Sequence, residues 1–206
     1  MCTYQGAGVV SRELFDCFAG RIGLFHNQPA DQLLDTADVV IAVGYIQVEY
    51  EPSLWNKGRK RHLVHTDVVA ADIDKDYRPQ LELTGDIATT LHALAAQAER
   101  PTPSADAQLL SEIARDRRQF AAHGATLHGV PIHPMRLVHE LQSMLSDDMA
   151  LCLDMGSFHI WLARYLYSFR ARQLLISNGQ QTLDVGLPWA IAACLVRPSD
   201  KVISIL

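Results

Sequence analysis

The sequence has no excess of positive charge and no cysteine spacing that would hold a metal. Its 18 Lys and Arg residues are outnumbered by 23 Asp and Glu, which gives a formal net charge of −5. Proteins that bind nucleic acid usually present a basic face, so we expect no nucleic-acid partner. The cysteines form no CxxC pair and all lie in apolar contexts, which predicts buried, reduced side chains. They are Cys2, Cys17, Cys152 and Cys194.

A secretory leader and a long hydrophobic run are also missing. The first eight residues contain no basic segment followed by an apolar one, which a signal peptide requires. The longest apolar stretch, 187–196, is too short to cross a bilayer and contains a proline. We therefore expect no membrane partner and a cytoplasmic location.

The sequence does contain a regular alternation of short apolar runs and segments with helical periodicity. Strands are predicted at 38–44, 61–67, 150–154, 173–177 and 201–206. Helices are predicted at 11–18, 29–37, 86–98, 105–120, 134–145, 158–167 and 187–196. Strands that alternate with helices indicate an α/β fold with mostly parallel sheets.

A short polar segment with two prolines, 100–104, divides this pattern. We expect two Rossmann-like parallel-sheet units, one at 1–100 and one at 134–206, joined by a linker with a helix at 101–133. The chain opens on a strand-like stub and closes on an apolar strand with no following turn. This predicts that both units are incomplete, the first lacking its start and the second lacking its end.

A glycine-rich turn, Gly6-Ala7-Gly8, precedes the first predicted helix. Glycines let backbone N–H groups approach a phosphate at a helix N-terminus. The third glycine of a dinucleotide-binding fingerprint would fall at Ser11. A tight turn and a nicotinamide or flavin site therefore both remain open.

Small and polar residues follow two of the predicted strands. Asp154-Met-Gly-Ser-Phe158 comes after the strand at 150–154, and Asn178-Gly-Gln-Gln-Thr-Leu183 comes after the strand at 173–177. In open α/β sheets, ligands bind beyond the carboxyl ends of the strands. The two turns therefore predict a binding crevice at one edge of the sheet.

These turns and their surroundings resemble the acetolactate synthases, a family of thiamine-diphosphate-dependent enzymes. Residues 154–165 and 177–191 look like the start of the family's diphosphate-binding domain. Residues 4–14 and 50–55 resemble the middle domain of its catabolic, FAD-independent branch. The resemblance covers nearly the whole chain and implies thiamine diphosphate and Mg²⁺ as cofactors, without FAD.

The resemblance implies a cofactor-binding role for seven residues of the two turns. They are Met155, Gly156, Ser157, Phe158, Gly179, Gln181 and Leu183. The first turn would lie against the diphosphate, and the second would shape the pocket. Leu183, where the family usually has Met, would support the two rings of a bent cofactor, which brings an internal base near the reacting carbon. Asp184 stands where the family has Gly, and a carboxylate there would repel a diphosphate unless it pointed away.

The implied reaction is the decarboxylation of one pyruvate and its ligation to a second through hydroxyethyl-thiamine diphosphate, which gives 2-acetolactate. The family's activating Glu and its Mg²⁺ ligands match no position in this chain. We therefore expect no catalytic residue, no metal ligand and no activity from the chain alone. The resemblance also implies a homo-oligomer, either a dimer or a tetramer. The alternative is a non-catalytic ligand-binding or interaction module derived from the middle domain.

Overall fold

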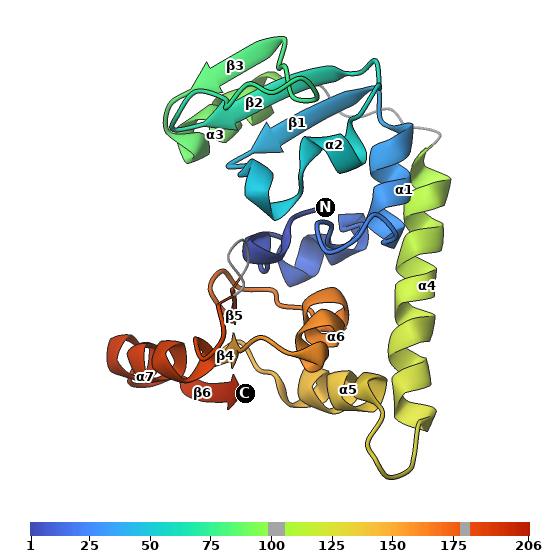
Figure 1. The fold of residues 1–206 in the computed structure, drawn as a ribbon, viewed down its shortest axis with the longest axis vertical. Helices are drawn as coiled ribbons and strands as arrows, with labels where there is room; N and C mark the ends of the chain where they lie inside the picture. Colours follow the sequence, from blue (N-terminus) through green and yellow to red (C-terminus); the bar gives the residue numbers. More distant parts are fainter. Residues whose placement is uncertain (99–105, 178–181) are drawn as a thin grey trace.

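The computed structural model describes residues 1–98, 106–177 and 182–206. Two small sheets lie toward opposite ends of the molecule, and the long helix α4 (Asp106–Thr126) runs along one side between them (Figure 1). Each sheet has three strands, and every strand pair is parallel. The predicted α/β fold with two parallel-sheet units is confirmed.

The first sheet has the strand order β1-β2-β3, formed by Val39–Val43, His62–Asp67 and Leu81–Thr84. The same part of the chain forms three helices, which are α1 (Pro29–Thr36), α2 (Pro52–Trp55) and α3 (Ile87–Gln97). Strand β3 and helix α2 were not predicted from the sequence. The core on one side consists of Leu34, Tyr50, Trp55, Leu63 and Tyr77.

Strand β1 differs from its prediction as a buried strand. Val39, Ile41 and Val43 are 50%, 55% and 41% exposed, whereas Val40 and Ala42 pack on the core. An unbroken apolar run predicts a strand covered on both faces. Among the described residues, only one face of β1 is covered.

The segment before α1 also differs from its prediction. The expected helix at 11–18 is a 3-10 helix, η2 (Arg12–Cys17), and a shorter one, η1 (Tyr4–Gly6), precedes it. The strand-like stub at the start reduces to a single parallel bridge between Cys2 and Arg21. A third 3-10 helix, η3 (Gln47–Glu49), follows β1. Short pieces of this kind form where tertiary contacts, rather than helical periodicity, set the backbone.

Helix α4 is longer than the predicted helix at 105–120, and it continues past Gly124 to Thr126. A Cβ at Gly124 would lie 2.7 Å from the carbonyl oxygen of Met135. The glycine therefore allows α4 to approach α5 (Pro134–Met144) closely. The proposed boundary near residue 100 lies outside the described residues, so the division into domains stays a prediction.

The second sheet has the order β5-β4-β6, formed by Leu174–Ile176, Met149–Leu153 and Lys201–Ile205. Central strand β4 is buried on both faces. Leu151 and Leu153 join a core that includes α5 and α6 (Ser157–Tyr165), whereas Cys152 packs against α7 (Gly186–Val196). This unit therefore has helices on both faces of its sheet.

Two further expectations concern cysteines and membranes. All four thiols are free, but only Cys152 is fully buried, and the prediction of burial is wrong for Cys17 and Cys194, which are exposed. Within the described ranges, none of the helices combines the length and the apolar character that a bilayer crossing requires.

Candidate functional site

The two predicted turns leave the second sheet at the same edge. Strands β4 and β5 are parallel neighbours, with Leu151 opposite Leu174 and Leu153 opposite Ile176. Their carboxyl ends therefore lie side by side, which is the arrangement that brings ligand-binding loops together in α/β sheets. The segments that follow β4 and β5 therefore start at this shared edge.

The carboxylate of Asp154 connects the two turns. Its Oδ1 accepts hydrogen bonds from the backbone N–H of Met155 at 2.6 Å and of Asp184 at 3.0 Å. Its Oδ2 accepts one from the N–H of Gly186 at 3.0 Å. Hydrogen bonds from the backbone N–H groups hold the pKa of Asp154 below its usual range, and the bond from Met155 contributes most, followed by the bond from Gly186. The side chain is thus a charged anchor that fixes the spacing between the turns.

The local sequence predicts no role for Asp154 beyond its place at the start of a motif. The one sequence feature that could have indicated this role is a carboxylate placed directly after a predicted buried strand. Its partners Asp184 and Gly186 lie 30 and 32 residues away in the chain. The hydrogen bonds therefore depend on which strands become neighbours, and that was not readable from local sequence.

The first turn presents the beginning of α6. Gly156 and Ser157 are exposed, and Met155 and Phe158 are half-buried. Gly156 is the N-cap residue, and as a glycine it offers no side chain to cap the N–H groups of the first helical turn. Unbonded N–H groups at a helix N-terminus attract anions such as phosphate.

One steric restriction and one hydrogen bond characterise this turn. A Cβ at Gly156 would lie 2.6 Å from the Cε1 atom of Phe158, so a larger residue would displace that ring. The buried imidazole of His159 lies with Nδ1 3.2 Å from the carbonyl oxygen of Asp154. A carbonyl only accepts, so Nδ1 carries the proton. Burial lowers the pKa of His159, which favours the neutral ring.

The second turn is partly described. The predicted site residues Gly179 and Gln181 lie outside the described residues. Leu183 is 67% exposed, so its apolar side chain lies at the surface of this edge and not in the core. Asp184 has a φ of 63°, a left-handed conformation that glycine adopts more readily than other residues. Its side chain is exposed, while its N–H is bonded to Asp154.

The described residues fit thiamine diphosphate better than they fit its metal. An uncapped helix start and an exposed apolar side chain lie on two turns that share one anchor. No group of three His, Cys, Asp or Glu side chains able to hold a metal occurs in the described ranges. Both oxygens of Asp154 already accept backbone hydrogen bonds. The described residues therefore offer no ligand set for Mg²⁺.

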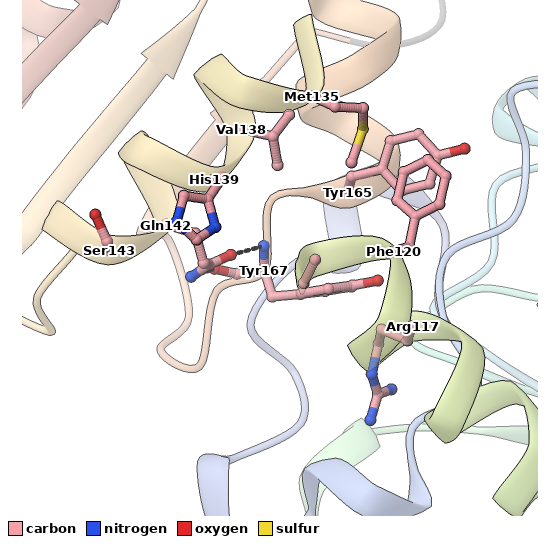
Figure 2. Close-up of a pocket in the computed structure, with 10 residues that line it drawn as sticks. Arg117, Phe120, Met135, Val138, His139, Gln142, Ser143, Tyr165 and Tyr167 are labelled. Atoms are coloured by element: carbon pink, nitrogen blue, oxygen red, sulfur yellow. Dashed lines mark hydrogen bonds between the residues drawn. The ribbon is translucent and has the colours of Figure 1, made fainter. Parts of the chain in front are cut away.

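A separate hollow of about 200 Å³ lies between α4, α5 and the end of α6 (Figure 2). Phe120 of α4 stacks on Tyr165 of α6 with ring centroids 4.3 Å apart. Gln142 accepts a hydrogen bond from the N–H of Tyr167 at 2.6 Å, and Arg117 donates to the carbonyls of Phe15 and Phe18. These polar groups are already bonded, so the hollow is a packing contact between α4 and the second unit.

The glycine-rich turn at 6–8 has a structural explanation. Gly8 has a φ of 88°, and a Cβ there would lie 2.1 Å from the carbonyl oxygen of Arg170. The helix that follows is the six-residue 3-10 helix η2. The close approach favours the tight turn over a nicotinamide or flavin site.

A parallel α/β sheet with a helix start at the carboxyl ends of its strands is the arrangement found in many domains that bind phosphate-bearing ligands. Sequence comparison specifies the cofactor class. Residues 1–94 match the central domain of thiamine pyrophosphate enzymes, and residues 154–206 match their C-terminal TPP binding domain. The chain belongs to the thiamine pyrophosphate enzymes and, within them, to the acetolactate synthase family.

The relatives that establish the family are longer than this chain. It is 52% identical over 204 residues to the catabolic acetolactate synthase of Raoultella terrigena and 44% identical over 207 residues to the acetolactate synthase of Bacillus subtilis. It is 25% identical over 208 residues to the isozyme 2 large subunit of Escherichia coli. The matches cover 98%, 98% and 99% of this chain and 36% of each relative. The chain thus spans about a third of their length.

Proposed function

We propose that this chain supplies the central and cofactor-binding parts of an acetolactate synthase, which decarboxylates one pyruvate and joins it to a second to give 2-acetolactate. The observation that carries the proposal is the pair of turns held together by Asp154 in a chain with 52% identity to a catabolic acetolactate synthase. Thiamine diphosphate, when bound, supplies the electron sink for the loss of CO₂.

The chain's own residues would bind and orient the cofactor. The N–H groups at the start of α6 would hold the diphosphate, and the exposed side chain of Leu183 would support the rings. Asp154 would fix the distance between these two contacts. The proposed binding residues are Met155, Gly156, Ser157, Phe158, Gly179, Gln181 and Leu183.

Several finer assignments belong to the same proposal. We propose Mg²⁺ held by groups other than the described residues, independence from FAD, and a homodimer or homotetramer as the working assembly. Independence from FAD is supported by the likeness of residues 4–14 and 50–55 to the catabolic branch. The free thiols fit the cytoplasm as the compartment. We also keep the division into 1–100, 101–133 and 134–206.

A chimera tests the proposal. The matching segment of the Raoultella terrigena enzyme is replaced by this chain, and acetolactate formation from pyruvate is measured with added thiamine diphosphate and Mg²⁺. We expect turnover, because the chain would then meet the rest of a complete enzyme. The unmodified relative is the positive control.

The chain by itself is the matched negative control. We expect no acetolactate from it, because the described residues offer no metal site for a diphosphate. A chimera that folds and assembles like the relative, yet forms no acetolactate, would contradict the proposed function. In that case the alternative of a non-catalytic module would gain weight.

A further inference from the structure

The guanidinium of Arg21 lies buried between the segment that starts the chain and the second unit. Arg21 is 4% exposed, and its backbone is fixed by the parallel bridge to Cys2. Its Nη1 donates to the carbonyl oxygen of Ala163 in α6. Its Nε has no hydrogen-bond partner among the residues that the structure describes.

Within the described ranges, no acidic side chain acts on this buried cation. The ionisable groups that influence its pKa are the Cys2 thiol and the phenols of Tyr167 and Tyr4. All three are neutral near pH 7 in a buried setting. A buried donor without an acceptor is costly, so an acceptor at Nε would be stabilising.

A second unbonded polar atom lies beside the same small cavity. Ser168, in the loop between α6 and β5, is 4% exposed, and its Oγ has no partner within the described ranges. Arg21 and Ser168 both line a cavity of about 10 Å³. The other walls are mostly apolar and include Val9, Phe15 and Phe18. Two side chains from distant parts of the sequence, each with an unbonded polar atom among the described residues, therefore line the same cavity.

We propose that this cavity is a binding site for a single water molecule, which accepts a hydrogen bond from Arg21 Nε and is bonded to Ser168 Oγ. The volume suits one water, since about 10 to 15 Å³ is the least that holds one. Phosphate and other polyatomic anions are too large. The water joins the start of the chain to the loop that leads into β5, and so it fastens the first segment to the unit that carries the candidate site.

A crystal structure of the 206-residue chain, grown with sodium bromide in place of chloride, tests the site directly. We expect one density peak within hydrogen-bond distance of Arg21 Nε and Ser168 Oγ, without anomalous signal. Anomalous bromide signal at that position would show a halide site and overturn the proposal. A well-ordered cavity without any peak would overturn it as well.

A stability measurement tests the same bond in solution. Ser168→Ala removes one partner of the water, and we expect the melting temperature to fall by roughly 2 to 6 °C. Ser111→Ala is the matched control, because its hydroxyl is exposed on α4 and bonds only within that helix. We expect that control to stay within about 1 °C of the parent. Equal melting temperatures for the two variants would overturn the proposal.

Discussion

The sheet β5-β4-β6 and the sheet β1-β2-β3 are both parallel and three-stranded, but they differ in how they are covered. Strand β4 has helices against both faces, and its residues from Ala150 to Leu153 are almost completely buried. Strand β1 shows Val39, Ile41 and Val43 on an uncovered face. The candidate site stands at the end of the covered sheet, where a rigid core can hold two turns at a fixed spacing.

The strand ends differ in the same way. At the end of β4, Asp154 binds three backbone N–H groups and joins two turns. At the end of β1, Gly44 has a φ of 58° and donates its N–H to the carbonyl of Thr66. One edge is fixed by a charged anchor, and the other turns through a glycine. The strand end in the second unit is therefore held by more hydrogen bonds than the one in the first unit.

The largest expected effect comes from core truncation in the two sheets. Leu153→Ala should cost about 2 to 5 kcal/mol of unfolding free energy, because it leaves a cavity in a closed core. Ile41→Ala should cost under about 1 kcal/mol, because the side chain is already exposed. Denaturant unfolding of the 206-residue chain measures both.

Ile41→Ala also checks the comparison itself. A loss as large as that of Leu153→Ala would mean that the face of β1 is covered in solution. Repeating the unfolding at two protein concentrations would then reveal self-association, since a cover from a second copy makes stability depend on concentration.

The next effect concerns the anchor between the turns. Asp154→Ala leaves three backbone N–H groups without their acceptor, and we expect the melting temperature to fall by roughly 5 °C or more. Asp154→Asn keeps one oxygen and should lose less. Asp148→Asn is the control, because Asp148 is exposed and lies before β4, away from the turns. Equal losses for Asp148→Asn and Asp154→Ala would contradict the anchoring role.

The pH dependence of this anchor has a definite sign. The hydrogen bonds lower the pKa of Asp154 in the folded chain, so its stabilising contribution is complete above the ordinary carboxyl pKa. The contribution is lost as the pH falls through the lowered value. The gap in stability between the parent and Asp154→Asn should therefore be constant above about pH 5 and shrink below about pH 4.

A smaller effect is expected from His159, whose pKa is lowered by burial. The unfolded chain takes up a proton at a higher pH than the folded chain, so stability falls as the pH drops below about 6.5. His159→Asn keeps a donor near the position of Nδ1 but does not titrate. We expect it to remove up to about 1 kcal/mol of this loss per pH unit, measured by unfolding between pH 5 and 8. His92→Asn is the matched control, because His92 is exposed on α3. Identical pH profiles of stability for the parent and His159→Asn would refute the prediction.

The elements of the second unit could be predicted from the sequence because each is local. The strand at β4, the helices α5, α6 and α7 and the strand at β6 follow from periodicity and from Gly and Pro positions within a few residues. The exposure of β1 could not be predicted, because an apolar run does not reveal which of its faces is covered. The 3-10 helix η2 was missed for a related reason: Phe15 packs edge-on against Tyr167 and Phe169, far away in the sequence.

The candidate site also combines features that local sequence predicts with features that depend on distant contacts. The two turns were recognised from residue types that follow strands, and their shared edge follows from parallel pairing. The role of Asp154, the burial of His159 and the water site at Arg21 and Ser168 all depend on contacts between distant segments. A carboxylate at Asp184 would repel a diphosphate unless it pointed away, and the local sequence does not reveal that its N–H bonds Asp154 while its side chain is exposed. Local sequence shows which groups are present, and only the fold shows which of them meet.

The smallest effect on stability is expected from substitution of Leu183. Because stability hardly changes, any loss of activity in the chimera would report on cofactor binding. The side chain of Leu183 is 67% exposed, so Leu183→Ala should change the unfolding free energy by less than about 0.5 kcal/mol. In the chimera the same change should lower acetolactate formation and weaken thiamine diphosphate binding, because a methyl group cannot support the rings. Leu183→Met restores a bulky apolar side chain and should retain activity. Leu187→Ala, on exposed α7 surface, is the matched control. If Leu183→Ala left the chimera as active as the parent, the proposed ring support would be wrong, while the anchor at Asp154 would still stand.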